Sequence, residues 1–251
     1  MRRAGLLLLA LLAGPAQAAW QWDAPLEVST AVGPAIFPHV ESANRQGLAV
    51  AGGTVGVVWE DNRSGAPRCY VAYRPATAPA FAAEADLSAG ECYEPAIAPL
   101  DGAGRFLAAW EEDGAVWVRA LPGGNPVRLS VSTAAQATLA THGNQAYVAW
   151  AEQAGRFKRI VVAALAVDGD ALAVRVMRPI EAAAPTDEQA WPALAVTAGG
   201  DVVAVWEDRR HKHTVPYGSR ASAGGLDFAP VARISDQRSG RVDGLGAGLG
   251  A

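Results

Sequence analysis

One pattern recurs four times along the chain and constrains its fold more than any other feature. An aliphatic residue followed by alanine is succeeded, 11 to 13 residues later, by a tryptophan that ends an apolar run. The pairs are Leu48-Ala49, Ile97-Ala98, Leu139-Ala140 and Leu194-Ala195, and the tryptophans are Trp59, Trp110, Trp150 and Trp206. A repeat of 40 to 56 residues that reads as several short strands is typical of the blades of a β-propeller.

Each repeat reads as four strands. The first holds the apolar pair, a glycine-containing turn follows, and the second ends in the tryptophan. Third strands are clear at residues 69–73, 115–120 and 160–164 and weaker near 217–221. Fourth strands follow an apolar-polar-apolar-Ser pattern at residues 85–88, 127–130 and 231–235, which is degenerate around 174–180. We therefore predict an all-β propeller of four-stranded antiparallel blades at about residues 36–88, 93–130, 137–180 and 190–235.

The fourth-strand pattern also appears ahead of the first repeat, at residues 25–29. We predict a closing strand at residues 22–29 that joins the last blade and removes the open edges of the ring. This leaves one more fourth-type strand than the four recognisable blades need, and residues 237–251 form a glycine-rich tail. The interpretation is a propeller incomplete at its C-terminus, with a four-bladed ring carrying a spare strand as the alternative.

Residues 1–18 have the features of a secretory signal peptide. Arg2 and Arg3 form the charged start, residues 6–12 the apolar stretch, and residues 16–18 an A-x-A cleavage site. The apolar stretch is too short to span a bilayer, and no later segment is long and apolar enough. We expect a secreted or periplasmic protein, cleaved after Ala18, with no membrane insertion.

The net charge and the cysteine content limit the classes of partner and the cellular compartment that we expect. The formal net charge of −4 gives no indication of nucleic acid or an anionic membrane as a partner. Cys69 and Cys92 are the two cysteines, and they form no C-x-x-C motif. In an oxidising compartment such an isolated pair predicts a structural disulfide rather than a reactive thiol pair.

Two short motifs carry a family resemblance. Residues 59–63 read W-E-D-N-R, residues 206–209 read W-E-D-R, and residues 222–228 look like a decayed Asp-box. With these motifs, about residues 35–236 resemble the sialidase-like (neuraminidase) propeller superfamily and its bacterial exported relatives. The resemblance implies an arginine triad for a substrate carboxylate, a Tyr-Glu nucleophile pair and an Asp acid/base. The chain departs from that pattern, because it has no F-R-I-P-type motif and its second and third repeats lack the arginine.

In such a propeller, the loops after the second strands and before the first strands open on one face, which we predict to bind ligand. The candidate binding residues are Glu60, Asp61, Arg63, Trp191, Glu207, Asp208, Arg209 and Arg210. Carboxylates, arginines and an aromatic platform suit sugar rings and their hydroxyls, and clustered carboxylates could also hold Ca²⁺. The alternative is structural: an Asp and an Arg two residues apart at a strand end can cross-link neighbouring hairpins.

Catalytic residues are harder to find. The candidates are Tyr93, Glu94 and Tyr217, while residues 211–213 (His-Lys-His) lack a third zinc ligand and are interpreted as a solvated loop. The leading hypothesis is a non-catalytic module that binds a glycan or an envelope protein. One alternative is a glycoside hydrolase acting on sialic acid or a related sugar acid, with Arg63, Arg209 and Arg210 clamping the carboxylate. Another is a structural scaffold within a cell-surface assembly.

Overall fold

The computed structural model describes residues 23–40 and 46–235, which form strands and turns and no helix that could cross a membrane. The strands build four antiparallel sheets of four strands each, so the predicted all-β architecture of four-stranded blades is confirmed. Each sheet follows chain order from an inner to an outer strand. The first sheet contains β1 (Leu48–Ala51), β2 (Thr54–Asp61), β3 (Arg68–Pro75) and β4 (Ala85–Asp86). The second contains β5 (Cys92–Pro99), β6 (Phe106–Glu112), β7 (Ala115–Leu121) and β8 (Val127–Arg128). The third contains β9 (Ala134–His142), β10 (Gln145–Ala154), β11 (Phe157–Asp168) and β12 (Ala171–Pro179). The fourth contains β13 (Gln189–Val196), β14 (Val202–Asp208), β15 (Val215–Ala221) and β16 (Ala232–Arg233).

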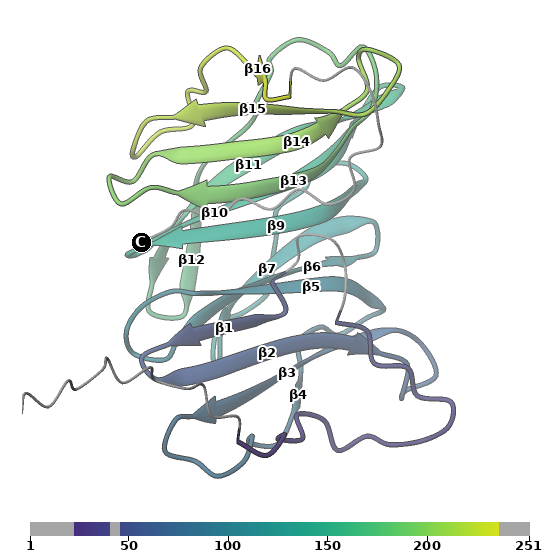
Figure 1. The fold of residues 1–251 in the computed structure, drawn as a ribbon, viewed down its shortest axis with the longest axis vertical. Coiled ribbons are helices and arrows are strands. Elements are labelled where there is room, and N and C mark those ends of the chain that lie inside the picture. The colour runs from purple at the N-terminus through teal and green to yellow at the C-terminus, as the bar shows by residue number, and fades with distance from the viewer. Residues whose placement is uncertain (1–22, 41–45, 236–251) are drawn as a thin grey trace, which may run out of the picture.

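The four sheets are arranged as successive blades of a propeller. The inner strands β1, β5, β9 and β13 lie next to one another in order, and each sheet packs face to face on the next (Figure 1). The first and fourth sheets lie at opposite ends of the long axis. Among the strands that the structure describes, none of the fourth sheet packs extensively on one of the first. The described blades therefore form an arc rather than a closed ring.

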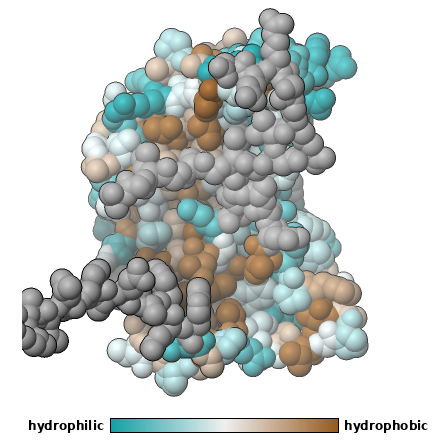
Figure 2. All heavy atoms as spheres, in the orientation of Figure 1, coloured by the Kyte–Doolittle hydropathy of each residue, from teal (hydrophilic) through white to brown (hydrophobic). Residues whose placement is uncertain are grey.

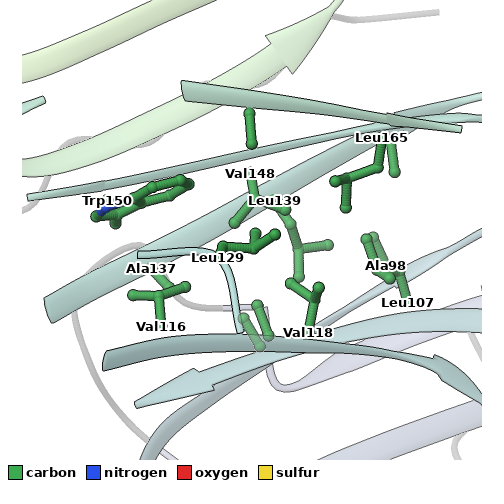
Figure 3. Packing of buried hydrophobic residues seen from close by; sticks show 14 of the residues in the cluster. Ala98, Leu107, Val116, Val118, Leu129, Ala137, Leu139, Val148, Trp150 and Leu165 are labelled. Atoms are coloured by element: carbon green, nitrogen blue, oxygen red, sulfur yellow. The ribbon is translucent and has the colours of Figure 1, made fainter. Parts of the chain in front are cut away.

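Three hydrophobic layers fill the spaces between consecutive sheets. Figure 3 shows the middle layer, in which Leu107, Val116 and Val118 of the second sheet face Leu139 and Val148 of the third. The layers on either side join the first sheet to the second and the third sheet to the fourth. Since burial of apolar area contributes roughly 25 cal/mol per Å², these layers are the main source of stability.

Small residues allow the blades to approach closely at their inner ends. Gly52, in the β1–β2 turn, has a φ of 52°, and a Cβ there would lie 2.0 Å from the carbonyl oxygen of Gly102. A larger residue would force apart the turns of the first two blades. Alanines such as Ala49 and Ala98 also allow close approach within the strands, because their small side chains are buried between sheets.

The disulfide predicted from the cysteine pair is present. Cys69 in β3 and Cys92 in β5 are bonded, with Cα atoms 5.4 Å apart, and both are fully buried. The bond joins the first blade to the second beside the hydrophobic layer between them. It is compatible with an oxidising compartment.

Two other expectations concern the ends of the chain. Residues 23–30 form no strand, and Val28 packs against Trp59, Tyr70 and Ala72 of the first sheet. The segment predicted to close the ring therefore covers part of the first blade and is not paired with the fourth sheet. The predicted signal peptide and the tail at 237–251 lie outside the described residues.

The disulfide should stabilise the pair of blades that it joins. Replacing both Cys69 and Cys92 by alanine is expected to lower the free energy of unfolding by about 2–4 kcal/mol, because the unfolded chain gains freedom over the loop between them. Urea unfolding monitored by tryptophan fluorescence would measure the loss. The wild type in reducing agent should reach the same midpoint as the variant, and an unchanged midpoint for both would contradict the prediction.

Candidate functional site

Each second strand makes the same hydrogen bond between its tryptophan and the carboxylate two residues further on. The indole Nε1–H donates to that carboxylate over 2.8 to 3.3 Å. The four pairs are Trp59–Asp61, Trp110–Glu112, Trp150–Glu152 and Trp206–Asp208. Side chains two apart on a strand share a face, and a buried indole N–H requires an acceptor. The third residue of the W-E-D motif therefore accepts the hydrogen bond of a tryptophan buried in the core.

In the first blade the same carboxylate also holds an arginine. Nε of Arg63 lies 2.9 Å from Oδ1 of Asp61, and the guanidinium pairs with Glu84 and donates to Ser29 Oγ over 2.8 Å. It lies 4.0 Å from the ring centroid of Tyr70. Burial by itself would raise the pKa of Asp61, but hydrogen bonds from Arg63 and the indole outweigh it and the pKa is lowered. Arg63 is thus engaged by protein groups on several sides.

The fourth blade repeats this cluster with different residues. Nε of Arg210 lies 2.9 Å from Oδ1 of Asp208, the guanidinium pairs with Glu181, and its Cζ lies 4.4 Å from the ring centroid of Tyr217. The hydrogen bond to Asp208 is the largest cause of a raised pKa of Arg210, although burial opposes it. The second arginine of the W-E-D-R-R run takes the place of Arg63, and Arg209 is exposed. The cross-linking alternative considered for these motifs accounts for both clusters.

The second and third blades replace the aspartate by glutamate and dispense with the arginine. Glu112 Oε1 accepts a hydrogen bond from the backbone N–H of Gly90 over 2.8 Å, and Glu152 Oε2 accepts one from Val131 over 3.2 Å. Gly90 and Val131 belong to the loops that lead into the inner strands of the same blades. The longer side chain reaches these loops directly, which explains why the arginine of the motif is missing in these two repeats.

The second residue of the motif points to a different neighbour. Glu60 Oε2 accepts a hydrogen bond from the backbone N–H of Glu94 over 2.8 Å, and Glu111 Oε1 accepts one from Gln136 over 2.6 Å. Each bond runs from a second strand to the inner strand of the following blade. These carboxylates therefore link consecutive blades at the end of the strands where ligand was predicted to bind. We call each such hydrogen bond between consecutive blades a pin.

The third blade makes its pin in another way. Ala151 occupies the second position of its motif, and the amide Oε1 of Gln136 instead accepts the hydrogen bond from the backbone N–H of Trp191 over 2.9 Å. Glu207 stands at the corresponding position of the fourth blade. The pins thus connect all four blades in order.

The residues that donate these bonds share an uncommon backbone conformation. Glu94, Gln136 and Trp191 have φ values of 55°, 63° and 51°, and each lies at a β-bulge near the start of an inner strand. Positive φ is costly for residues other than glycine, and such residues gather at functional sites. Sequence reasoning identified Trp191 and Glu94, but Gln136 was missed because a lone glutamine in an alanine-rich strand gives no signal.

Two of the three catalytic candidates, Tyr93 and Tyr217, hydrogen-bond side chains outside the candidate set. The hydroxyl of Tyr93 donates to Glu91 Oε2 over 3.0 Å, and this bond is the main cause of a raised pKa of Tyr93. Tyr217 is buried in the fourth blade, where its hydroxyl lies 2.8 Å from Nε2 of His211.

No group of three or more metal-ligating side chains gathers anywhere in residues 23–40 and 46–235. A small cavity of about 220 Å³ lies beside the Arg210 cluster, between residues 181–187 and the end of β14. Asp208, Arg210 and Gln189 line it, and the amide of Gln189 donates to both Asp208 and Glu181. Its polar walls are therefore already hydrogen-bonded to one another.

Comparisons with known proteins agree with the fold. No protein-family model and no curated protein matches the sequence. An α-L-arabinofuranosidase from Podospora anserina, solved in complex with cellotriose, is similar with a TM-score of 0.50 and 10% identity, over 86% of this chain and 73% of that chain. The catalytic domain of a GH62 α-L-arabinofuranosidase from Coprinopsis cinerea is similar with a TM-score of 0.49 and 7% identity, over 86% and 73%. At 10% identity the likeness to the first of these structures shows the fold alone, which is a β-propeller.

The two arginines of the last motif should differ in their effect on stability. Replacing Arg210 by alanine is expected to lower the free energy of unfolding by about 1.5–3 kcal/mol, because Asp208 is left buried without its charged partner. Replacing the exposed Arg209 by alanine should change it by less than about 0.5 kcal/mol. Chemical unfolding of both variants measures the difference, and equal effects would show that the cluster is not structural.

The pin between the second and third blades can be tested separately. Replacing Glu111 by alanine should cost about 1–2 kcal/mol of stability, since the backbone N–H of Gln136 loses its acceptor. Glutamine at position 111 keeps an acceptor oxygen and should restore most of the loss. Thermal unfolding followed by circular dichroism measures both, and a Glu111→Gln variant no better than Glu111→Ala would argue against the hydrogen bond.

Proposed function

We propose that the protein is a non-catalytic module that binds neutral glycans on the face where the inner strands begin. The observation that carries the proposal is the set of three equivalent bulges, which bring Glu94, Gln136 and Trp191 to neighbouring inner strands in strained backbone conformations. Tyr93, beside the first of them, is 38% exposed. Aromatic rings beside carboxylate and amide acceptors are the groups that bind sugar rings and hydroxyls.

Several contacts support binding rather than catalysis. Glu60 and Glu111 accept hydrogen bonds from backbone N–H groups of the following blade, so both carboxylates link blades, whereas a glycosidase uses its two carboxyl groups on the substrate. The glutamates at this position of the first two motifs are thus used within the protein, which supports binding over catalysis.

The charges of this face favour a neutral sugar over a sugar acid. Glu60, Glu94, Glu111 and Glu207 lie at the strand ends that form it. The arginines that a sialoside clamp would use are largely committed, because Arg63 and Arg210 each pair with two carboxylates. A ligand carboxylate would therefore meet like charge, at a cost that neutral hydroxyls avoid.

Calorimetric titration tests this proposal. Cellotriose, the ligand of the Podospora anserina enzyme of the same fold, is the first probe, and sialyllactose is the anionic counterpart. Cellotriose should bind without hydrolysis, and Trp191→Ala should weaken binding by at least about tenfold, equivalent to 1.4 kcal/mol. Phe228→Ala, at the opposite ends of the strands, should leave binding unchanged.

Two results would overturn the proposal. Hydrolysis of either sugar, lost on substitution of Glu94, would establish an enzyme. Binding of sialyllactose in preference to cellotriose, lost with Arg209→Ala, would restore the sugar-acid hypothesis.

A further inference from the structure

The two ends of the arc differ from its interior in the same way, because each exposes an apolar residue whose equivalents are buried in other blades. Leu48 on β1 is 59% exposed, although the equivalent residues of the other inner strands, Ile97, Leu139 and Leu194, are 0%, 1% and 5% exposed. Strand pairing establishes the equivalence, since each residue lies opposite the same position of its second strand. In the later blades this residue packs within the sheet stack, and in the first blade it faces solvent.

The outer strand of the fourth blade shows the complementary departure. Ile234 is 57% exposed, whereas Leu87 and Leu129 at the same position of the first two blades are 1% and 4% exposed and lie within the layers toward the following blade. All three donate their backbone N–H to the third strand of their own sheet, to Pro216, Cys69 and Val116 respectively.

The fourth blade carries the rest of a forward face, meaning the face that a blade turns to its successor. In the second blade this face consists of Ala96, Ala98, Leu107, Ala109 and Val118, all buried in the middle layer. The corresponding residues of the fourth blade are Ala193, Ala195, Val203, Val205 and Gly218. They have the same small and apolar character and belong to none of the hydrophobic layers of the described residues. The two alanines are buried, and the other three residues are half-buried.

The first blade carries the matching backward face, the face that a blade turns to its predecessor. Trp59 and Tyr70 stand where Trp206 and Tyr217 stand in the fourth blade, with Leu48 and Val50 beside them. Val28 and Phe81 cover the outer part, and Leu48 and Val50 remain 59% and 56% exposed. Phe37 and Val40, ahead of β1, are also exposed, and Figure 2 shows hydrophobic atoms at this end of the molecule.

We propose that these two faces bind each other between two copies of the chain, with the fourth blade of one copy packed on the first blade of the other. The two faces have the composition of the three internal interfaces, so together they form a fourth interface of the same kind. The described strands of the two blades do not meet within one chain, because they lie at opposite ends of the long axis (Figure 1). The apolar side chains that such an interface would remove from water are Leu48, Val50 and Ile234, which are 59%, 56% and 57% exposed.

The interface is head to tail, so each copy offers one face of each kind. Sedimentation equilibrium of the purified protein should give a concentration-dependent dimer or larger species. Leu48→Asp, which alters the backward face, and Ile234→Asp, which alters the forward face, should each yield monomers. Val131→Asp is the matched control, since Val131 is 75% exposed and lies on neither face.

Mixing the two monomeric variants gives the sharpest test. The Leu48→Asp chain keeps an intact forward face and the Ile234→Asp chain an intact backward face, so an equimolar mixture should recover a one-to-one dimer. Circular dichroism would show that each variant is folded. A monomeric wild type, dimers unaffected by both substitutions, or a mixture that stays monomeric would overturn the proposal. A monomeric wild type would leave a different polypeptide as the partner of these faces.

Discussion

Burial of one tryptophan in each sheet is the constraint on which the rest of the structure depends. The indole fills the space toward the preceding blade in the last three sheets and lies beneath Val28 and Phe81 in the first. Its N–H cannot be buried without an acceptor. The carboxylate two residues further on supplies that acceptor in all four blades, on the same face of the strand. A buried carboxylate in turn needs donors, and these come from Arg63 and Arg210 in the outer blades and from loop amides in the middle two.

The alternation of side chains along a strand gives the two acidic residues of the motif different roles. Asp61 shares a face with Trp59 and is 1% exposed, whereas Glu60 points to the other face and reaches the next blade. One acid therefore stabilises its own blade, and the other fixes the position of its neighbour. The bulges that donate these hydrogen bonds are strained, and the hydrogen bonds help to hold them in place.

The arc has the same construction throughout, including its two ends. Internal blades hide both faces, whereas the first blade leaves Leu48 and Val50 exposed on one face and the fourth blade leaves Ile234 exposed. A repeat protein distributes its stability over nearest-neighbour interfaces, so terminal units ordinarily carry a polar outer face. Here Leu48 and Ile234 keep the apolar character of their buried equivalents, which distinguishes these ends from ordinary caps.

The sequence by itself determined the fold class, the number of described blades and the disulfide, because these depend on local periodicity and on a single cysteine pair. It could not separate the roles within the W-E-D motif or predict that Arg210, rather than Arg209, takes the place of Arg63. It also predicted a closing strand at residues 22–29, whereas residues 23–29 form no strand and Val28 packs on the first blade. The pins through Glu60, Glu111 and Gln136 join residues 25 to 55 apart in the chain, so only the packing of one sheet on the next decided them.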